Sequence, residues 1–474
     1  MAMSQAATEA APNDLRVLDT RHHFHPFTDH GALNAKGGPR VIVRAEGVHL
    51  WDSDGRRLID AMAGLWCVNV GYGRRELAEA AARQMEELPY YNTFFQTTHP
   101  PAAELGRVLA EVTPPGFAHV FFTNSGSEAN DTVIRMVRRY FDLLGQPERS
   151  VILSRDNAYH GSTMGSASLG GLKTMHGQGG LPIPGIEHVM EPYWYKLGGD
   201  ETPEEFGLTA ARAVEERILA LGPERVAAFI AEPIQGAGGV IVPPDTYWPE
   251  VARICREHGV LLVADEVICG FGRTGPWFGT EYYGLDPDLM PIAKGLSSGS
   301  LPIGGVMVHD RIAEVLVGRG GEFFHGFTYS GHPVACAVAL ENIRILREER
   351  IVERCAEHTV PYFQAKVRAL ADHPLVGEVR GAGMLATLQL AEDPETRKRF
   401  EPEGDVGALC RDRCFANGLV MRSVAESMVL SPPLVITRSE IDEVVEKARR
   451  SLDETLDTIA RPGGLAGATS AGSG

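Results

Sequence analysis

Residues 289–299 read Leu289-Met290-Pro291-Ile292-Ala293-Lys294-Gly295-Leu296-Ser297-Ser298-Gly299. Lys294 follows a short apolar run with no acidic neighbour, which places its amine at the end of a strand that is expected to be buried. An ammonium is costly in that position, so burial lowers the pKa of the lysine and makes its amine a nucleophile, as in Schiff-base lysines. A side chain that reaches from the strand end back to water would give the same pattern, and position alone leaves both interpretations open.

Asp265 is the second residue of this kind, because it ends the apolar run from Val260 to Ala264. A buried carboxylate needs a cation or several hydrogen-bond donors. A protonated pyridine nitrogen supplies that cation, and the pairing keeps the ring of pyridoxal phosphate an electron sink. The stretch between Asp265 and Lys294 is long enough for one strand-to-strand connection, so we expect both residues at strand ends that face a single ring.

The middle of the chain alternates strand and helix patterns, which is typical of a mainly parallel sheet with helices on both faces. Short apolar runs, as expected for strands buried on both faces, are residues 120–122, 151–153, 226–231, 260–264, 289–293 and 306–308. The spacing of apolar residues predicts helices at 76–88, 101–112, 204–221 and 334–350.

The two ends of the chain carry a different pattern. Residues 41–60, 376–381 and 384–390 alternate as in an antiparallel sheet, and helices are predicted at 406–417 and from Arg438 onward. We therefore predict an α/β fold in which both chain ends form a smaller α+β domain. Residues 1–65 and 341–461 would flank a large cofactor-binding domain at 66–340, while residues 1–14 and the tail at 462–474 would be disordered.

Polar motifs follow the predicted strands at their carboxyl ends, where ligands bind in open α/β sheets. Ser125-Gly126-Ser127 opens a helical pattern and offers backbone N–H groups and a helix dipole to a phosphate, although an ordinary N-cap has the same sequence. Tyr159 could stack on a flat ring or belong to the core, and Glu232 follows the strand at 226–231.

Three other patterns do not carry the chemistry that they suggest. Residues 270–275 fit the dinucleotide motif G-x-G-x-x-G, but Pro276 follows and no helix opens there. Residues 295–299 fit the hydrolase motif G-x-S-x-G, but the chain leads into another strand instead of a helix. The cluster His22-His23-Phe24-His25 has no acid or cysteine at ligand spacing, so no metal site is expected and a packing or interface role is favoured.

The composition excludes several classes of partner. With 474 residues, 44% hydrophobic and 23% charged, the chain can bury a large core. A net charge of −17 argues against nucleic acid or an anionic membrane surface as the main partner. We see no signal peptide and no apolar stretch of bilayer length, and the seven scattered cysteines imply no disulfide framework. We expect a reduced, cytoplasmic enzyme.

Taken together, these stretches resemble the class III aminotransferases, pyridoxal-phosphate enzymes of the aspartate-aminotransferase fold (fold type I). The resemblance covers residues 20–458 and rests on Ser125-Gly126-Ser127-Glu128-Ala129-Asn130, Tyr159-His160-Gly161, Ala231-Glu232-Pro233-Ile234-Gln235-Gly236, Ala264-Asp265-Glu266-Val267, Gly270-Phe271-Gly272-Arg273-Thr274-Gly275 and Ala293-Lys294-Gly295. Within the class, residues 65–73, 90–95 and 325–333 look like the ω-amino acid or amine:pyruvate branch.

The resemblance implies a role for each matching position. Lys294 would form the Schiff base and shuttle the proton, and Asp265 would pair with the pyridinium nitrogen. Residues that the resemblance places at the cofactor are Ser125, Gly126, Ser127, Tyr159, Glu232, Asp265 and Val267, with Tyr159 and Val267 on opposite faces of the ring. Thr328 of a second subunit would join them, because active sites in this family lie at a homodimer interface. A dimer and a dimer of dimers both remain open.

The same resemblance implies a substrate pocket. Arg422 matches the family's mobile arginine, which would bind a carboxylate and swing away from an apolar or amino-bearing side chain. In the ornithine and 4-aminobutyrate branches an acid pairs with this arginine. Here Ala237 holds that place, which argues for pyruvate as acceptor. Trp66 and Phe94, the latter also serving the neighbouring pocket, would form an aromatic wall for alkyl or aryl amines.

Two positions depart from the family pattern. Ile268 stands where several branches carry a glutamine near the cofactor's phenolic oxygen. Ala425 stands where relatives usually show the glycine of a Gly-Asp pair. We expect the bulk of Ala425 to limit the motion of Arg422 and to alter the range of donors.

The leading hypothesis is a pyridoxal-phosphate-dependent transaminase that moves an amino group from an amine or ω-amino acid to pyruvate, giving alanine, by a ping-pong mechanism through Lys294. A polyamine- or taurine-specific transaminase is a variant of it, and putrescine, β-alanine, taurine and aryl alkyl amines all remain open as donors. The nearest rival is an aminomutase or decarboxylase on the same scaffold. A catalytically silent binding protein is disfavoured by the intact Lys294, Asp265 and phosphate turn.

Overall fold

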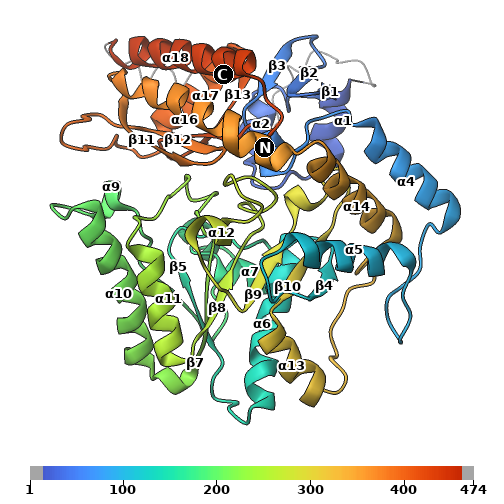
Figure 1. The fold of residues 1–474 in the computed structure, drawn as a ribbon. Coiled ribbons are helices and arrows are strands. Elements are labelled where there is room, and N and C mark those ends of the chain that lie inside the picture. The colour runs from blue at the N-terminus through green and yellow to red at the C-terminus, as the bar shows by residue number, and fades with distance from the viewer. Residues whose placement is uncertain (1–13, 462–474) are drawn as a thin grey trace, which may run out of the picture.

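The chain folds into a large α/β domain and a smaller domain that contains both chain ends (Figure 1). This computed structural model describes residues 14–461, and most of the disorder predicted at the two ends falls on residues 1–13 and 462–474, outside the described part. Asp14 was expected in the disordered N-terminus. It instead caps helix α1 (Leu15–His22), because its side chain accepts a hydrogen bond from the Arg16 N–H at 2.9 Å.

A seven-stranded sheet forms the centre of the large domain, in the order β4-β10-β9-β8-β7-β5-β6. Its strands are β4 (His119–Thr123), β5 (Val151–Arg155), β6 (Ile186–Val189), β7 (Val226–Ala231), β8 (Leu261–Ala264), β9 (Leu289–Ile292) and β10 (Gly304–Val308). Strands β6, β5, β7, β8 and β9 pair in parallel, whereas β10 runs antiparallel to β9 and to β4. The carboxyl ends of the parallel strands therefore meet at one edge of the sheet.

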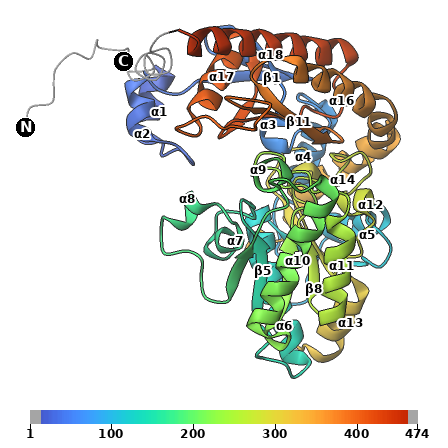
Figure 2. The same ribbon diagram turned by 90° about the vertical axis from the view of Figure 1, so that its left-hand side faces the viewer.

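Strand β7 shows why these strands are continuous apolar runs. Ala228 and Ile230 pack in one core with α6 (Gly126–Leu143), whereas Phe229 and Ala231 pack with α10 (Pro203–Leu221) and α11 (Tyr247–His258). Successive side chains of a strand point to opposite faces, so a strand covered on both faces has no polar positions. Figure 1 shows α10 and α11 on one side of the sheet and α6 on the other, and Figure 2 views the molecule from the side that α10 and α11 cover.

The other helices of the large domain connect or flank these layers. They are α3 (Ala63–Trp66), α4 (Arg75–Glu87), α5 (Pro100–Val112), α7 (Met164–Leu169), α8 (Lys173–His176), α9 (Trp194–Leu197), α12 (Gly279–Tyr283), α13 (Asp310–Arg319) and α14 (Pro333–Glu348). Helix α14 packs against both α4 and α5, which covers the edge of the sheet near β4.

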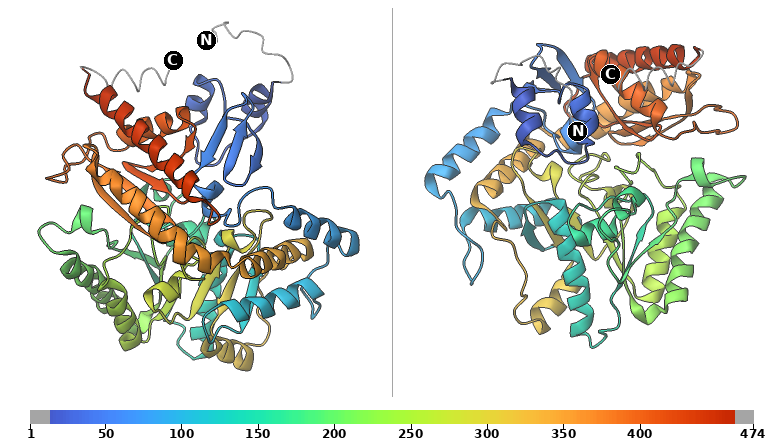
Figure 3. Two further views of the ribbon diagram at one scale, coloured as in Figure 1. Left: turned by 45° about the horizontal axis from the view of Figure 1, so that its top comes forward. Right: turned by 180° about the vertical axis from the view of Figure 1, so that it is seen from behind.

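Both chain ends build the smaller domain (Figure 3). One sheet has the order β1-β2-β3-β13, and the other has the antiparallel order β11-β12-β15-β14. The strands are β1 (Ile42–Glu46), β2 (His49–Asp52), β3 (Arg57–Asp60), β11 (Val376–Ala382), β12 (Leu385–Leu390), β13 (Leu419–Val420), β14 (Arg422–Val424) and β15 (Ser427–Leu430). The C-terminal β13 pairs in parallel with the N-terminal β3, so the two chain ends share one sheet.

Most helices of the smaller domain come from the C-terminal part of the chain. They are α2 (His30–Ala35), α15 (Ile351–Arg354), α16 (Val360–Arg368), α17 (Asp405–Ala416) and α18 (Arg438–Ile459). Thr437 opens α18 with a capping box, in which its side chain and that of Glu440 each accept a backbone N–H of the other residue. Within residues 14–461, no helix combines the length and the apolarity that crossing a bilayer requires.

The predicted fold class is confirmed, and the predicted helices and strands begin and end within about two residues of the expected positions. The elements that the sequence pattern missed include β6, α11, α13 and α16, together with several shorter helices and strands. Strand β6 reads Ile186-Glu187-His188-Val189 and pairs only with β5, so it lies at the sheet edge and carries no continuous apolar run. The domain boundaries at residues 65 and 340 stay a prediction.

The histidines near the N-terminus correct one expectation. The pattern around His22 shows no neighbouring acid, but Asp19 lies one helical turn before His23 and contacts its Nδ1 at 3.0 Å and the Nε2 of His25 at 2.6 Å. Residues four apart share one face of a helix, which a search of adjacent positions overlooks. These hydrogen bonds lower the pKa of Asp19.

Candidate active site

A cavity of about 340 Å³ lies at the carboxyl ends of the parallel strands, where open α/β sheets bind their ligands. Its walls come from the start of α6 and from the segments that follow β5, β7, β8 and β9. The predicted residues that line it are Ser125, Gly126, Ser127, Tyr159, Glu232, Asp265, Val267 and Lys294. The sheet thus brings together the lysine, the carboxylate and the phosphate turn that the sequence places far apart.

Lys294 follows β9 with its backbone in the left-handed region, at φ 47°. This conformation is uncommon for a residue with a Cβ and often marks a functional site. Burial lowers the pKa of the Lys294 amine, and the charge of Asp265 opposes this effect only in part. Its Nζ lies 5.6 Å from the centre of the Trp66 ring. The structure therefore favours the nucleophilic amine over a side chain that reaches to bulk water.

Asp265 is almost fully buried, at 2% exposure, and has several hydrogen-bond donors. One carboxylate oxygen accepts from Asn130 Nδ2 at 2.8 Å and from His160 Nδ1 at 2.6 Å, and the other accepts from the Val267 N–H at 3.0 Å. Strand β8, which carries Asp265, pairs with β9, which leads to Lys294. The expectation that neighbouring strand ends carry these two residues is confirmed.

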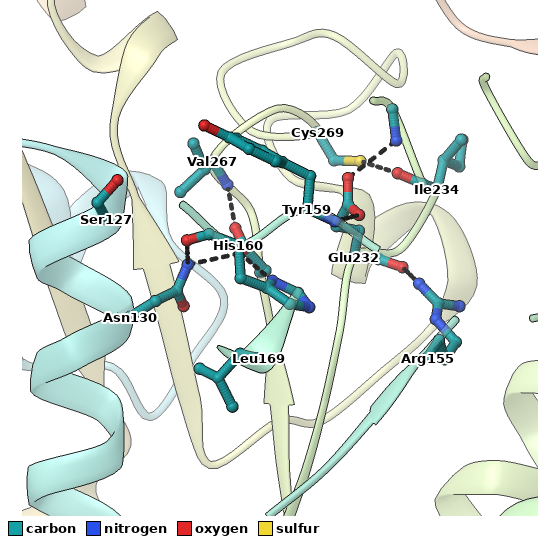
Figure 4. A network of polar contacts seen from close by, with 12 residues as sticks. Ser127, Asn130, Arg155, Tyr159, His160, Leu169, Glu232, Ile234, Val267 and Cys269 are labelled. Atoms are coloured by element: carbon teal, nitrogen blue, oxygen red, sulfur yellow. Dashed lines mark hydrogen bonds and ion pairs between the residues drawn. The ribbon is translucent and has the colours of Figure 1, made fainter. Parts of the chain in front are cut away.

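Asn130 and His160 are site residues whose roles sequence reasoning missed. Asn130 Nδ2 bridges the His160 carbonyl oxygen, at 2.7 Å, and the Asp265 carboxylate. Figure 4 shows this network, with Asn130 reaching in from α6 beneath Tyr159. Both residues stand inside motifs that were recognised as a whole, but only the tertiary contact shows that they orient the carboxylate.

The Ser125-Gly126-Ser127 turn opens α6 as predicted. Ser125 is the N-cap, and its hydroxyl accepts from the Glu128 N–H at 3.2 Å. The backbone N–H groups of Gly126 and Ser127 lie in the first turn, which has no intrahelical acceptors for them. A Cβ at Gly126 would lie 3.0 Å from the side chain of Val267, so glycine keeps this turn close to the cavity wall. The turn suits an anion such as a phosphate.

Tyr159 and Glu232 meet on the side of the cavity formed by β5 and β7. The Glu232 carboxylate accepts from the N–H groups of Tyr159, at 3.1 Å, and Gly236, at 2.8 Å. Burial raises the pKa of Glu232. The Tyr159 hydroxyl contacts Ser162 Oγ at 3.1 Å, which holds the phenol ring across the cavity mouth.

Trp66, Arg422 and Ala237 lie on the small-domain side of the site. The Arg422 guanidinium lies 5.1 Å from the centre of the Trp66 ring, the same ring that faces Lys294. Burial lowers the pKa of Arg422, and this side chain forms no ion pair within residues 14–461. Ala237 is buried in one apolar cluster with Trp66 and Ile268. Ile268 therefore packs in the wall and offers no hydrogen bond to a cofactor.

Phe94 and Thr328 lie elsewhere in this chain. Phe94 lines a second cavity with Phe121 and Gly326, and a Cβ at Gly326 would lie 2.8 Å from the Phe94 ring. Thr328 is exposed, and its carbonyl oxygen accepts from the Tyr90 hydroxyl at 2.8 Å. Neither residue lines the cavity around Lys294, so their roles depend on a second subunit and stay predictions.

Ala425 lies at the turn between β14 and β15, with φ 47°. Its carbonyl oxygen faces Gly407 of α17, where an added Cβ would approach to 1.9 Å. It does not line the cavity. Any effect on Arg422 would therefore pass along the short strand β14.

A buried lysine, a buried carboxylate and an anion-binding turn around one cavity define a pyridoxal-phosphate enzyme of fold type I. The chain belongs to the class III aminotransferases: the model of the family "Aminotransferase class-III" matches residues 32–452. The enzyme is thus an aminotransferase that uses pyridoxal phosphate, and the side chains present fit that cofactor.

The chain is also similar to individual proteins of this family. The chain is 61% identical to the putrescine–pyruvate aminotransferase of Pseudomonas aeruginosa, over 96% of this chain and 100% of the relative. A thermostable (S)-enantioselective ω-transaminase from Thermomicrobium roseum is 45% identical with a TM-score of 0.90, over 93% of this chain and 98% of that one. The ω-transaminase of Pseudomonas jessenii in complex with PMP is 41% identical with a TM-score of 0.91, over 94% and 98%.

Proposed function

We propose that this enzyme transfers the terminal amino group of an ω-amine, a diamine in particular, to pyruvate and forms alanine. The observation that carries the proposal is Arg422, a partly buried guanidinium beside the cavity that has no ion pair within residues 14–461. Ala237 provides no carboxylate to neutralise it. The 61% identical relative named for putrescine and pyruvate supports the same assignment.

The residues around the cavity would divide the work. Pyridoxal phosphate supplies the electron sink for cleavage of the donor's C–H bond when it is bound. Lys294, whose pKa burial lowers, would accept the proton from the donor carbon and return it to the acceptor carbon. Asp265, oriented by Asn130 and His160, would keep the ring nitrogen protonated.

Other residues would position the cofactor. Ser125, Gly126 and Ser127 would bind its phosphate at the start of α6. Tyr159 and Val267 would contact opposite faces of its ring. Glu232 would hold the Tyr159 and Gly236 loops through its two backbone hydrogen bonds.

Arg422 would act in only one half of the cycle. Pyruvate carries a carboxylate next to its carbonyl, and a charge-assisted hydrogen bond to it is worth about 1.5–3 kcal/mol. A diamine has no carboxylate, so Arg422 would turn away during the first half-reaction. An internal acid partner would compete with pyruvate for the guanidinium, which is why its absence favours this acceptor.

We also propose a homodimer with shared active sites, as Phe94 and Thr328 lie outside this chain's own cavity. Exposed aromatic residues gather beside them: Phe95 is 88% exposed, Phe324 79% and Tyr329 58%. Such a patch is typical of a protein interface. Assembly into a dimer of dimers and a cytoplasmic location would be compatible with this proposal.

A donor panel with pyruvate as acceptor tests the function. Putrescine, β-alanine, taurine and 1-phenylethylamine are each incubated with the enzyme, pyridoxal phosphate and pyruvate, and alanine is measured together with carbon dioxide. We expect alanine in amounts equal to the donor consumed, highest with putrescine, and none with the Lys294→Ala variant. Carbon dioxide release, or an amine that migrates within the donor without alanine, would assign a decarboxylase or an aminomutase instead.

A further inference from the structure

The segment that carries Trp66 has an unusual backbone. It follows β3 directly, and its torsion angles are left-handed at Ala63 (φ 47°), Gly64 (φ 67°, ψ −90°) and Trp66 (φ 59°). Residues with a Cβ rarely adopt such angles and keep them only where the surroundings over-determine the conformation. Something near this segment must therefore hold it.

Asp60 is the group that holds it. Its side chain is fully buried, and it forms no ion pair in the part of the chain that the structure describes. One oxygen accepts from the Met62 N–H at 2.9 Å, and the other accepts from the Gly64 N–H at 2.6 Å and from the Tyr72 hydroxyl at 2.7 Å. The Asp60 carboxylate thus binds the backbone N–H groups on both sides of Ala63.

Tyr72 connects the Asp60 carboxylate to the loop between β1 and β2. Its backbone N–H donates to the Gly47 carbonyl oxygen at 2.8 Å, and its own carbonyl oxygen accepts from the Gly47 N–H at 3.0 Å. Gly47 lies between β1 and β2. The Tyr72 hydroxyl therefore contacts Asp60 from a backbone that is itself paired with the loop between β1 and β2.

Trp66 links the backbone that Asp60 contacts to the two cationic side chains of the site. Its ring is 2% exposed and lies 5.6 Å from Lys294 Nζ and 5.1 Å from the Arg422 guanidinium carbon. The indole Nε1 has no hydrogen-bond partner within residues 14–461, so no bond of its own fixes the ring. The orientation of the ring therefore depends on the apolar side chains packed around it and on the backbone of its own segment, which Asp60 contacts.

We propose that Asp60 and Tyr72 are positioning residues that set donor selectivity by holding Trp66 against Lys294 and Arg422. Neither touches the cavity around Lys294. A fixed indole narrows the donor side of the pocket to slender aliphatic chains, and a loosened one admits a bulkier aryl group. The inference rests on the proposed transamination of amines, because it concerns which donors that reaction accepts.

The first test needs no activity. The chain has five tryptophans, so 5-fluorotryptophan labelling gives resolvable ¹⁹F signals in the cofactor-loaded enzyme, and Trp66→Phe identifies that of residue 66. Tyr72→Phe should shift or broaden this signal and leave the others unchanged. Tyr362→Phe is the matched control, because it removes another tyrosine–aspartate hydrogen bond, to Asp442 at 2.8 Å, from the smaller domain. An unchanged Trp66 signal in Tyr72→Phe would overturn the proposal.

The second test compares donors. For Tyr72→Phe we expect kcat/KM for putrescine to fall about fivefold to tenfold, mostly through a higher KM. The ratio of kcat/KM for 1-phenylethylamine to kcat/KM for putrescine should rise. In a Trp66→Ala background the same substitution should no longer change the ratio of the two donors. An equal loss for both donors, or an equal change of the ratio in both backgrounds, would refute a role through Trp66. Asp60→Asn should change the donor ratio in the same direction and by a larger factor. If Asp60→Asn does not fold, Tyr72→Phe alone still tests the proposal.

The two tests separate the inference from the proposed function. A wild-type enzyme that forms no alanine from any amine would refute the function, while the ¹⁹F signal would still report whether Asp60 and Tyr72 hold Trp66. Alanine formation with an unchanged Trp66 signal would leave the function standing and refute the inference.

Discussion

The Lys294 amine and the Arg422 guanidinium both lie close to the Trp66 ring, 5.6 Å and 5.1 Å from its centre, and neither has an ion pair within residues 14–461. Burial lowers the pKa of both. For Lys294 the consequence is an amine that gives up its proton more readily than an exposed lysine does. Arg422 stays charged at any physiological pH, so a carboxylate that binds beside it would stabilise this unpaired charge.

The lowered pKa of Lys294 predicts a pH dependence of stability in the cofactor-free protein. Between the folded pKa and the ordinary lysine value, the unfolded chain binds more protons than the folded chain, so the free energy of unfolding rises as pH increases through this window. Denaturation of the cofactor-free enzyme at a series of pH values, from neutral to about 10, measures this slope. Lys294→Met should remove it, whereas Lys173→Met, at an exposed position, should leave it unchanged. An identical slope in the wild type and Lys294→Met would contradict the prediction.

Arg422→Leu tests the carboxylate site. Loss of one charge-assisted hydrogen bond, about 1.5–3 kcal/mol, should lower kcat/KM for pyruvate about 10- to 100-fold. Propanal is the control acceptor because it has no carboxylate, and its kcat/KM should change little. Equal losses for the two acceptors would mean that Arg422 acts on something other than the carboxylate.

At the scale of elements, the site depends on where strands end and on how the next segment turns. Strands β8 and β9 carry Asp265 and Lys294 to one edge of the sheet, and α6 directs its first turn at the same cavity. From the smaller domain, β3 leads into the Trp66 segment and β14 begins with Arg422. In the proposed function, the reaction chemistry would depend on residues at the edge of the large sheet, and substrate selection would depend on elements that extend from the two small sheets.

The turn between β14 and β15 predicts a stabilising substitution. Ala425 has φ 47°, which glycine adopts at no steric cost but which costs a residue with a Cβ about 1–2 kcal/mol. Ala425→Gly should raise the free energy of unfolding by about 1 kcal/mol, after the greater backbone entropy of the unfolded glycine is subtracted. Chemical denaturation measures it, and no gain in stability would contradict the argument. The same variant tests the expectation that Ala425 restrains Arg422, which an unchanged donor profile would refute.

At the scale of the whole molecule, several exposed aromatic side chains belong to the segments around residues 94–95 and 324–329. Phe95 and Phe324 lie beside Phe94 and Thr328, the two predicted site residues that do not reach their own chain's cavity. Burial of this patch against a second copy would complete both sites at once. Assembly and catalysis would then depend on the same surface.

Phe95→Asp should disrupt this assembly. A charge at the centre of an apolar interface is left unpaired on association, so the variant should sediment mainly as a monomer and retain less pyridoxal phosphate. Leu219→Asp is the control, as this residue of α10 is 57% exposed but lies far from the patch in the chain fold. A variant that stays dimeric, or a monomer that keeps full activity, would argue against shared active sites. Analytical ultracentrifugation and cofactor absorbance provide the two readouts.

The amino-acid sequence by itself determined the chemistry of this protein. Lys294 and Asp265 could be singled out because each ends an apolar run, and Ser125-Gly126-Ser127 because it opens a helix. These signals are local, as a short window contains both the strand or helix and the polar residue at its end. The layers of the large domain followed from the same local periodicities, apart from short or half-buried elements such as β6.

Only the tertiary structure decided how these residues are held and which of them lie close together. The bonds of Asn130 and His160 to Asp265, and the hold of Asp60 and Tyr72 on the Trp66 segment, join residues that no sequence periodicity relates. Trp66 faces both Lys294 and Arg422 because β3 and β13, from opposite chain ends, pair in one sheet beside the cavity. Local sequence specifies local conformation, whereas a contact between distant segments exists only after the domains have packed.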